Sequence, residues 1–492
     1  MSPQHEERGT RNEERDLEPV IGLEIHVQLS TRTKMFCGCE LSFGDEPNIH
    51  TCPICLAHPG VLPVPNEQAI RYALMIAAAL ECEVAPRSIF HRKNYFYPDN
   101  PKAYQISQYD IPLARGGRLG DVRIHRVHLE EDAAKMIHVG ESGRIHGSGA
   151  SLVDFNRGGT PLVEIVTEPD LRGAAQAREW AQLLRTTIRQ LGVSDVNMEE
   201  GSLRVDANLS LRPAGSEELG VKTELKNMNS FRFLERGMEA ELERQRGLLE
   251  SGEPVEQETL HFDPASGTLT PLRSKEYAHD YRYFPEPDLV PLAPTEEMLR
   301  EAAEGLPELP AARIERYRDQ LDLAPEVATL LAGEPDTAAY FERALEAAEG
   351  VEAKVVANWV TGELAGALRQ DGGEAGPAES KVDPEALAGL VRMVQGRQVS
   401  HGAGKQVLAV LIAEGGDPAE IVEREGLGQI ADSSELEGVV EAAIEAEPEA
   451  AEEVRSGNDK AIGRIVGAVM RETKGRADGG EVQRLIREKL GA

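Results

Sequence analysis

Two carboxylates and a histidine in this 492-residue chain stand in a pattern that suits metal and phosphate chemistry. Glu24 and His26 are two residues apart in the alternating run VIGLEIHVQL, so they share one face of a strand. Glu164 has apolar neighbours on both sides in PLVEIV, where an unpaired charge would be costly. Oxygen ligands with one imidazole suit Mg²⁺, which often bridges to nucleotide phosphates, and they also suit proton transfer. A solvated polar face is the alternative for Glu24 and His26.

Three acidic residues follow one another in the segment HLEEDAAK, at Glu130, Glu131 and Asp132. Consecutive carboxylates repel one another unless a cation lies among them, although a solvated loop would also tolerate their charges. A strand through this segment would place Glu130 and Glu131 on opposite faces. The sequence leaves open which of the two joins the site.

Two further alternating segments, residues 203–211 and 221–226, carry polar residues opposite an apolar face. Asp206 and Asn208 lie on the polar face of the first segment, and Lys226 lies on that of the second. The chain has no G-x-x-x-x-G-K-[ST] phosphate loop and no protein-kinase signature. If the protein uses ATP, it therefore binds the nucleotide on an uncommon fold.

Four of the five cysteines form a cluster with the spacing C-x-C-x12-C-x2-C, at Cys37, Cys39, Cys52 and Cys55. Four thiolates satisfy Zn²⁺ tetrahedrally and leave no position for water, so the spacing predicts a structural zinc. Redox chemistry at Cys52 and Cys55 is less favoured, because the other two cysteines supply a matching pair of ligands. His50 or His58 could replace one of the cysteines.

Basic and aromatic residues are concentrated between residues 90 and 110, in a chain with only 4% aromatic residues. The basic members are Arg92, Lys93 and Lys102, and the aromatic members include Tyr95, Phe96, Tyr97, Tyr104 and Tyr109. Such a mixture stacks bases and holds phosphates in nucleic-acid binders, and it can also line a polar cavity. A proline-rich loop packed on the core is the alternative.

The last part of the chain, residues 458–490, is expected to form two amphipathic helices separated by a basic break. Its basic residues include Arg464, Arg471, Lys474 and Arg476. These positive charges could contact RNA phosphates, but the ordinary preference of basic residues for helix ends explains them equally well.

The elements that must hold these residues change character along the chain. Alternating segments up to about residue 290 predict strands of an antiparallel or mixed sheet, with helices near residues 66–81, 173–191 and 230–250. After a proline-rich run, the sequence is rich in Ala, Glu and Leu and predicts only helices. We therefore expect an α+β protein, with a mixed-sheet body followed by a helical middle domain and a small helical tail domain.

The length of the chain favours two or three domains. The expected parts are a disordered tail at residues 1–17, the body at 18–293 with a zinc-binding insertion at 37–55, the middle domain at 294–370, a linker at 371–380 and the helical tail region at 381–492.

The formal net charge of −32 argues at first against a nucleic-acid partner, because most nucleic-acid binders are basic. An acidic surface can still hold a local basic patch. No run of about 18 apolar residues occurs, and the polar N-terminus does not resemble a secretory signal. We therefore expect a cytoplasmic protein that does not cross a membrane.

Several segments together resemble the B subunits of the tRNA-dependent amidotransferases. They include VIGLEIHVQL, RKNYFYPDNPKAYQISQYD, HLEEDAAK, LVDFNRGGTPLVEIVTEPD, VNMEEGSLRVDANLSLRP, ANWVTGEL and AIGRIVGAVMRETKGRA. The resemblance runs in order from about residue 18 to the C-terminus, which makes it more specific than any single motif. It implies a cradle-shaped body around the active site, a helical domain, and a YqeY-like tail region that contacts tRNA.

The resemblance implies a heterotrimeric ligase. In this family an amidase, called the A subunit, frees ammonia from glutamine, and a small C subunit holds the amidase to the B subunit. The ammonia passes through a channel into the B subunit. There ATP phosphorylates the side-chain carboxylate of a misacylated Glu-tRNA(Gln) or Asp-tRNA(Asn), and ammonia displaces the phosphate. ATP, Mg²⁺ and, in some members, a structural Zn²⁺ held by four cysteines are the implied cofactors.

Carried over position by position, the resemblance assigns roles to the polar residues. The metal-binding and phosphoryl-transfer positions are Glu24, His26, Glu131 and Glu164, with Glu130 as the alternative to Glu131. Lys93 matches a basic position that faces the activated substrate. The implied neighbours of the substrate or channel are Asp206, Asn208, Lys226, Tyr95 and Tyr97, and the implied tRNA contacts are Arg464, Arg471, Lys474 and Arg476.

Three other functions stay open. An archaeal-type E subunit acts only on Glu-tRNA(Gln), but it carries a large insertion for which this chain has no room. A non-catalytic RNA-binding zinc protein would not need a glutamate buried in a strand. A zinc hydrolase would need an open position on its metal, which four sulfur ligands close. The sequence does not decide whether Glu-tRNA(Gln), Asp-tRNA(Asn) or both are the substrate.

Overall fold

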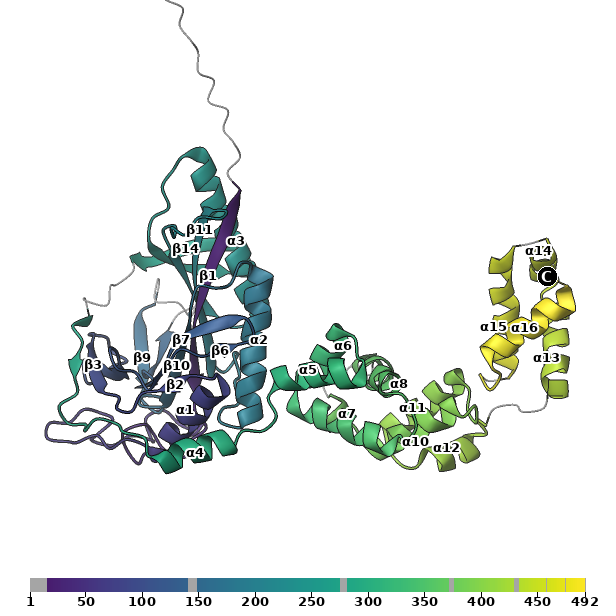
Figure 1. The fold of residues 1–492 in the computed structure, drawn as a ribbon, viewed down its shortest axis with the longest axis horizontal. Coiled ribbons are helices and arrows are strands. Elements are labelled where there is room, and N and C mark those ends of the chain that lie inside the picture. Colours follow the sequence, from purple (N-terminus) through teal and green to yellow (C-terminus); the bar gives the residue numbers. More distant parts are fainter. Residues whose placement is uncertain are drawn as a thin grey trace, which may run out of the picture. The chain divides into compact units, whose positions relative to one another are not determined.

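The computed structural model describes residues 16–139, 148–274, 281–370, 376–428, 433–456, 458–473 and 475–491. The chain divides into two compact units, Met1–Ala311 and Ala312–Ala492 (Figure 1). Within the described ranges the first unit is built on sheets and the second on helices alone, so the predicted α+β class is confirmed. None of the helices in these ranges has both the length and the apolar character of a membrane span.

The first unit is organised by its largest sheet, which has ten strands among the described residues. Nine follow the order β14-β13-β12-β11-β1-β10-β7-β5-β2, and β6 pairs with β7. Neighbouring strands are antiparallel except β12 and β13, which are parallel. The strands are β1 (Leu17–Gln28), β2 (Glu83–Val84), β5 (Ala114–Arg115), β6 (Arg118–Leu119), β7 (Val122–Glu131), β10 (Pro161–Thr167), β11 (Leu203–Pro213), β12 (Thr223–Met228), β13 (Glu258–Asp263) and β14 (Thr268–Ser274).

Strand β1 lies near the middle of this sheet, between β10 and β11. Its sequence alternates, so Ile21, Leu23 and Ile25 are buried on one face while Glu24 and His26 lie on the other. Three helices complete the hydrophobic core on the apolar face: α1 (Glu67–Ala79), α2 (Ala174–Leu191) and α3 (Phe231–Ser251) (Figure 1). The polar face is thereby left to build a site.

Two smaller sheets belong to the same unit. One contains β15 (Phe284–Pro285), β3 (Phe90–Asn94) and β4 (Tyr104–Gln108) in that order, and in the other β8 (Lys135–Val139) pairs with β9 (Ala150–Asp154). Arg92 on β3 donates hydrogen bonds of 2.7 and 2.8 Å to the buried carboxylate of Glu286. This pair holds the segment around β15 against the basic and aromatic stretch.

Helix α4 (Glu296–Glu304) ends the first unit. Its Ala302 is buried in the core of the sheet, and Met298 packs against that core. The first compact unit therefore extends to Ala311, past the boundary expected after residue 293. The apolar face of a short helix such as α4 predicts that the helix packs on a hydrophobic core, but it does not indicate which core.

The second unit holds two hydrophobic cores within the described residues. Leu364 and Leu387, which lie on either side of the expected linker at residues 371–380, are buried in the same core, so the linker does not divide two domains. Residues 371–375 lie outside the described part. The elements that contribute to this core are α5 (Pro310–Leu321), α6 (Pro325–Ala332), α7 (Pro335–Ala347), α8 (Ala353–Asn358), the π-helix η2 (Trp359–Leu364), α9 (Ala365–Gln370), α10 (Pro384–Gln395), α11 (His401–Glu414) and α12 (Pro418–Glu425). The short η3 (Pro377–Glu379) comes between α9 and α10 in the sequence.

The last core belongs to a four-helix group at the end of the chain. Its elements are α13 (Ser433–Ala446), α14 (Pro448–Arg455), the short η4 (Asp459–Ala461), α15 (Ile462–Glu472) and α16 (Gly479–Leu490). At the other end, residues 1–15 of the expected tail lie outside the described part, and Leu17 already begins β1.

Candidate active site

Three antiparallel strands bring the chemistry-bearing residues of the first unit together. His26 on β1 lies opposite Glu164 on β10, and Glu164 lies opposite His128 on β7. Glu130 follows His128 by two residues, so the period of a strand places it on the same face. Four side chains from distant parts of the sequence therefore meet on the polar face, and we call this group the His26 cluster.

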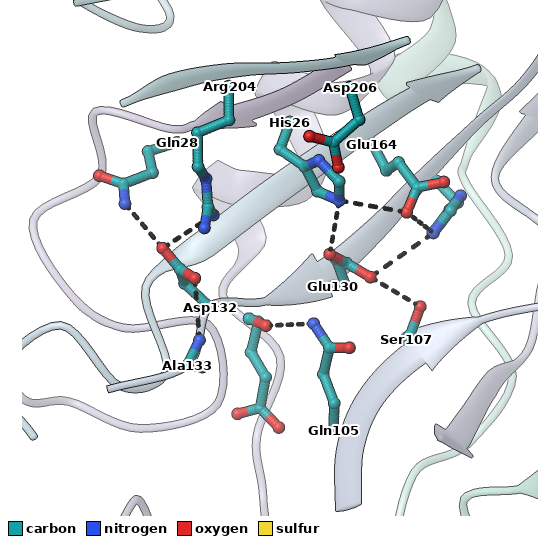
Figure 2. Close-up of polar contacts among 12 residues, drawn as sticks. His26, Gln28, Gln105, Ser107, Glu130, Asp132, Ala133, Glu164, Arg204 and Asp206 are labelled. Carbon is teal, nitrogen blue, oxygen red and sulfur yellow. Dashed lines mark hydrogen bonds and ion pairs between the residues drawn. The ribbon is translucent and has the colours of Figure 1, made fainter. Parts of the chain in front are cut away.

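The His26 cluster alternates two imidazoles with two carboxylates (Figure 2). His26 Nε2 lies 3.5 Å from Glu130 Oε1 and 3.4 Å from Glu164 Oε2. His128 Nε2 lies 3.7 Å from Glu130 Oε2 and 3.5 Å from Glu164 Oε2. Only 4% of the Glu130 side chain and 9% of the Glu164 side chain are exposed, so these charges have little access to water.

The charges of the His26 cluster shift one another's pKa. Burial alone would lower the pKa of His26, but the hydrogen bond and charge of Glu164, with the charge of Glu130, raise it above its ordinary value. Burial alone would raise the pKa of Glu164, but the charge of His128 and the contacts with His26 and Arg126 hold it well below its ordinary value. The pKa of Glu130 is also lowered, chiefly by its hydrogen bond with His128 against the effect of burial.

The His26 cluster has the donor set of a divalent cation site. His26 Nε2 and one oxygen each of Glu130 and Glu164 lie within 4.8 Å of one another. Two carboxylates and one imidazole fit Mg²⁺ when water and phosphate oxygens complete the coordination. His128 Nδ1 is buried without a hydrogen-bond partner among the described residues, so this histidine binds the cluster only through Nε2.

The structure brings Glu130, and not Glu131, into this cluster. Glu131 is the next residue on β7, but among the described residues its carboxylate is not part of the group that His26, Glu130 and Glu164 form. It pairs instead with Lys102 and accepts a hydrogen bond of 3.0 Å from the Ile106 amide. The expected assignment of Glu131 beside His26 and Glu164 is therefore corrected to Glu130.

Glu24 belongs to a neighbouring group rather than to the His26 cluster. Its carboxylate lies within 4.8 Å of those of Asp206 and Glu224, and its Oε1 is 3.3 Å from Asn208 Nδ2. Lys226 Nζ lies 2.8 Å from Asp206 and 3.3 Å from Glu224. Burial would lower the pKa of Lys226, but the charges of Asp206 and Glu224 raise it, so this group already contains its own cation.

Two cavities open on this polar face. One, of about 540 Å³, is lined by residues that include His26, Glu130 and Tyr95. The other, of about 590 Å³, is lined by residues that include Glu24 and Glu164. Three residues line both cavities, namely Lys93, Lys226 and Tyr281. Lys93 Nζ lies 4.8 Å from the centre of the Tyr281 ring. Tyr97 is 43% exposed and lines neither cavity.

Asp132, the third acidic residue of HLEEDAAK, is buried in a separate pair beside the cluster (Figure 2). Arg204 Nη2 lies 3.0 Å from Asp132 Oδ2, and Gln28 Nε2 donates to the same oxygen at 2.8 Å. No role was predicted from the sequence for Arg204 or His128. Their signal was alternation: Arg204 is two residues before Asp206, and His128 is two residues before Glu130.

The four cysteines meet as the spacing predicted. Their sulfur atoms lie within 4.8 Å of one another, with Cys52 Sγ and Cys55 Sγ 3.9 Å apart, and all four are free thiols. A tetrahedral Zn²⁺ with Zn–S bonds of about 2.3 Å spaces its sulfurs by about 3.8 Å. The cluster can therefore bind a metal such as zinc. His50 forms a 2.7 Å pair with Asp45 and is not part of the cluster.

The buried Lys34 gives the cysteine cluster a positive neighbour. Its side chain is almost completely buried, and its Nζ lies 2.9 Å from the Phe155 carbonyl and 3.7 Å from Cys55 Sγ. A hydrogen bond from Cys37 and, to a smaller extent, the charge of Lys34 lower the pKa of Cys55 to about 4, whereas the same hydrogen bond and burial raise the pKa of Cys37. The environment therefore favours the thiolate, which is the form that binds metal, at Cys55 and not at Cys37.

The basic residues expected to contact tRNA lie on or next to α15. Arg464 Nη2 forms a 2.6 Å salt bridge with Glu453, and both side chains are exposed. Arg476 Nε donates to the Thr473 carbonyl at 3.2 Å. Arg471 is exposed in the last turn of α15, and Lys474 lies outside the described residues.

Comparison with known proteins finds one family over most of the chain. Residues 19–300 match the family described as the GatB/GatE catalytic domain, and residues 339–490 match the one described as the GatB domain. A Persephonella marina protein, named as the B subunit of aspartyl/glutamyl-tRNA(Asn/Gln) amidotransferase, is 46% identical over 483 residues, which cover 96% of this chain and 100% of that protein. The Moorella thermoacetica protein of the same name is 48% identical over 483 residues, with the same coverage. The Anaeromyxobacter dehalogenans one is 47% identical over 486 residues, or 97% of this chain and 99% of that protein.

Proposed function

This chain belongs to the family of aspartyl/glutamyl-tRNA(Asn/Gln) amidotransferase B subunits, and from that premise we propose that it activates a misacylated aminoacyl-tRNA with ATP and amidates it. The substrate is Glu-tRNA(Gln), Asp-tRNA(Asn) or both. The chain works in the cytoplasm with an amidase, the A subunit, which frees ammonia from glutamine, and with a small C subunit. Its cofactors are ATP and Mg²⁺, with a structural Zn²⁺.

The proposed reaction has two steps. An oxygen of the side-chain carboxylate attacks the γ-phosphorus of ATP, the bond to ADP breaks, and an acyl phosphate forms. Ammonia then attacks the carbonyl carbon, phosphate leaves, and a base takes a proton from the nitrogen to give the amide. The first step is needed because phosphate is a far better leaving group than the oxygen of a free carboxylate.

The observation that carries this proposal is the buried His26 cluster. Ionised carboxylates as buried as Glu130 and Glu164 are stable only beside positive charge. We propose that His26, Glu130 and Glu164 hold Mg²⁺, while His128 orients the two carboxylates from behind. When bound, Mg²⁺ would spread the negative charge that develops on the transferred phosphoryl group. The adjoining cavity of about 540 Å³ is of the size that small-ligand sites have.

The lysines of the two cavities support the same proposal. Lys93 lines both cavities and forms no salt bridge among the described residues, so its ammonium is available to the substrate carboxylate or the phosphoryl group. Lys226 is instead committed to Asp206 and Glu224. We propose that Lys226, with Glu24, Asp206 and Asn208, forms a polar wall beside the reacting groups and does not bind a second metal.

Two further parts of the proposal lie outside the His26 cluster. We propose that the four cysteines hold one structural Zn²⁺, because four sulfur ligands complete a tetrahedral site. We also propose that tRNA contacts basic residues of the C-terminal region, at Arg464, Arg471, Lys474 and Arg476. The charges of Arg464 and Arg471 are exposed, as phosphate contacts must be.

The substitution Glu164→Gln tests the central proposal. We would assemble the three subunits and follow conversion of Glu-tRNA(Gln) to Gln-tRNA(Gln) with ATP, Mg²⁺ and ammonium chloride. Ammonia supplied in this way bypasses the amidase, so the activity measured belongs to this chain. We expect the wild-type complex to convert the tRNA and the Glu164→Gln complex to lose the conversion.

Glu168→Gln is a matched control, because Glu168 also pairs with a histidine but is more exposed. Glu168 lies 2.8 Å from His125, with 35% of its side chain exposed, four residues from Glu164. The control should keep its activity. Full activity in Glu164→Gln would make Glu164 a structural residue. A wild-type complex that amidates neither Glu-tRNA(Gln) nor Asp-tRNA(Asn) would overturn the proposed function in favour of a non-catalytic RNA-binding protein.

A further inference from the structure

The cavity of about 540 Å³ contains carboxylates whose partners can be compared one by one. Five of its described lining residues are acidic. Four of them pair with a basic side chain: Glu130 with His26, Glu131 with Lys102, Asp132 with Arg204 and Asp206 with Lys226. The fifth is Asp99, in the loop after β3.

Asp99 forms no salt bridge among the described residues. Its Oδ1 accepts a hydrogen bond of 3.1 Å from the Tyr95 hydroxyl, which is a neutral donor. Burial raises the pKa of Asp99 above its ordinary value, and the hydrogen bond from Tyr95 and the charge of Arg157 offset only part of that effect. Asp99 is thus a cavity carboxylate that no salt bridge neutralises within the described residues.

The basic side chains that line the same cavity are also all paired except one. His26, Lys102, Arg204 and Lys226 are each paired with one of the four carboxylates above. Lys93 forms no salt bridge among the described residues and lies instead over the Tyr281 ring. Within the described lining, Asp99 and Lys93 are therefore the acidic and the basic side chain that form no salt bridge, and a ligand can match both.

The aminoacyl end of the proposed substrate has this charge pattern. An aspartate or glutamate esterified through its α-carboxyl group keeps an α-amino group and a side-chain carboxylate. The carboxylate must approach the reacting centre, which Lys93 and the His26 cluster line. The amine is then left to be bound elsewhere in the cavity, and a nearby carboxylate favours its protonated form.

We infer that Asp99, oriented by the Tyr95 hydroxyl, binds the α-ammonium group of the aminoacyl ester and thereby fixes the substrate in the cavity. This inference rests on the proposed function, because it takes its ligand from that reaction. The α-ammonium group is common to aspartyl and glutamyl esters, whereas their carboxylates differ in reach by one methylene. An anchor at the amine therefore serves both substrates, and the preference should appear with both.

A pair of substrates that differ only in this group tests the inference. One is tRNA esterified with glutamate, and the other is tRNA esterified with 2-hydroxyglutarate, in which a hydroxyl group replaces the amine. We would measure single-turnover amidation of both by the three-subunit complex with ATP, Mg²⁺ and ammonium chloride. A charge-assisted hydrogen bond is expected to make the wild type prefer the amine by about 10- to 100-fold.

The variant Asp99→Asn keeps the shape of the side chain and removes its charge. We expect it to lose activity on the glutamyl ester but not on the hydroxy ester, so that the preference falls to about threefold or less. Tyr95→Phe should reduce the preference in part. Asp121→Asn is the control, because Asp121 is fully exposed outside this cavity and its loss removes the same charge.

Two outcomes would overturn the inference. One is an Asp99→Asn complex that keeps the wild-type preference for the amine. The other is a variant whose defect is confined to KM for ATP, which would place the nucleotide at Asp99. Equilibrium binding of the two esterified tRNAs to both complexes separates this inference from the proposed function. If nothing is amidated but the wild type still binds the glutamyl ester more tightly in an Asp99-dependent way, the inference holds and the reaction does not.

Discussion

The sheet face of the first unit and the last helices of the second unit are built from the same kinds of charged pairs but differ in burial. In the His26 cluster, 9% or less of each glutamate side chain is exposed, and each carboxylate contacts two imidazoles. In the last helices, Arg464 pairs with Glu453 while 51% and 41% of their side chains are exposed. The charged groups of the His26 cluster are buried, and those of the last helices are exposed to water.

This difference decides what each region can do. A buried carboxylate has lost its hydration and is held by a few fixed partners, so removing one partner or adding a cation changes its free energy strongly. An exposed pair is screened by water and salt and contributes about 0 to 1 kcal/mol. The first region is therefore suited to chemistry on a bound group. The second is suited to a weak, salt-dependent attraction that orients a large anion.

The sharpest test of this comparison uses the two adjacent glutamates Glu130 and Glu131. Glu130→Gln removes a charge from the His26 cluster and should lower the single-turnover rate of amidation by about 10²- to 10³-fold. Glu131→Gln removes an equally buried charge that pairs with Lys102 outside the cluster, and should cost about 10-fold or less. Rates would be measured with ammonium chloride as the nitrogen donor. Equal losses in both variants would mean that burial alone, and not membership of the cluster, sets the effect.

The cysteine cluster, in which Cys37 is buried and the other three cysteines are half-buried, extends the comparison to a site that we expect to be structural. Cys55→Ser should reduce the zinc content from about one ion per chain to none, because three sulfur ligands and a hydroxyl group bind zinc far more weakly. Cys82→Ser is the matched control, since Cys82 lies outside the cluster. Zinc would be measured by atomic absorption after dialysis against a weak chelator. A Cys55→Ser protein that retained its zinc would place the metal elsewhere.

The sequence predicted the polar faces of individual strands but not the contacts between them. Alternation put Glu24 with His26 and Glu130 opposite Glu131, because the period of a strand is a local property. Which of Glu130 and Glu131 faces His26 depends on the registers of two strand pairings, which bring together residues far apart in the sequence. The same registers bring His128 into the cluster, and the register of a third pairing, β1 with β11, places Glu24 opposite Asp206.

The cysteine cluster was predictable because ligand spacing within a short loop limits the geometry. The boundaries between the domains were not predictable, because the apolar faces of helices α4 and α10 do not indicate which core each helix packs on. The segment 371–380 has the composition of a linker, but the helices before and after it share one core. Composition predicts the local stiffness of a segment and not which helices pack together.

The pH dependence of stability tests whether the His26 cluster holds its charges without metal. The pKa of His26 is raised, so its contribution is fully present below its unfolded pKa, near 6.5, and is lost as the pH rises through the folded pKa. The pKa of Glu164 is lowered, so its contribution is present above the unfolded value, near 4.5, and is lost as the pH falls through the folded pKa. The two contributions therefore coincide between about pH 4.5 and 6.5.

We accordingly expect His26→Gln to destabilise the protein by about 1.5 to 3 kcal/mol in this window and by less at pH 8. Urea unfolding of both proteins in Mg²⁺-free buffer, at pH 5.5 and at pH 8, gives the two differences. A difference that is the same at both pH values would show that His26 stabilises the sheet by packing and not by charge.

The smallest effects on stability are expected in the C-terminal helices. There the pair of Arg464 with Glu453 also predicts which arginine contributes more to tRNA binding. Arg464→Ala and Arg471→Ala should each change the free energy of unfolding by less than about 0.5 kcal/mol. Arg471 forms no hydrogen bond or salt bridge in the part of the chain that the structure describes, whereas Arg464 must leave Glu453 before it can bind a phosphate.

Arg471→Ala should therefore weaken tRNA binding more than Arg464→Ala, and should reduce the slope of log K against log salt by about one. Glu453→Ala should strengthen binding, because it releases Arg464 and removes a charge that repels the phosphates. Binding of the three-subunit complex to tRNA would be titrated at several salt concentrations. If Glu453→Ala weakens binding, or if the salt slope is unchanged in all three variants, tRNA does not meet this side of the helices. The exposed charges of these helices would then contribute only to solubility. Of the two regions compared, only the sheet face would have a function in the reaction.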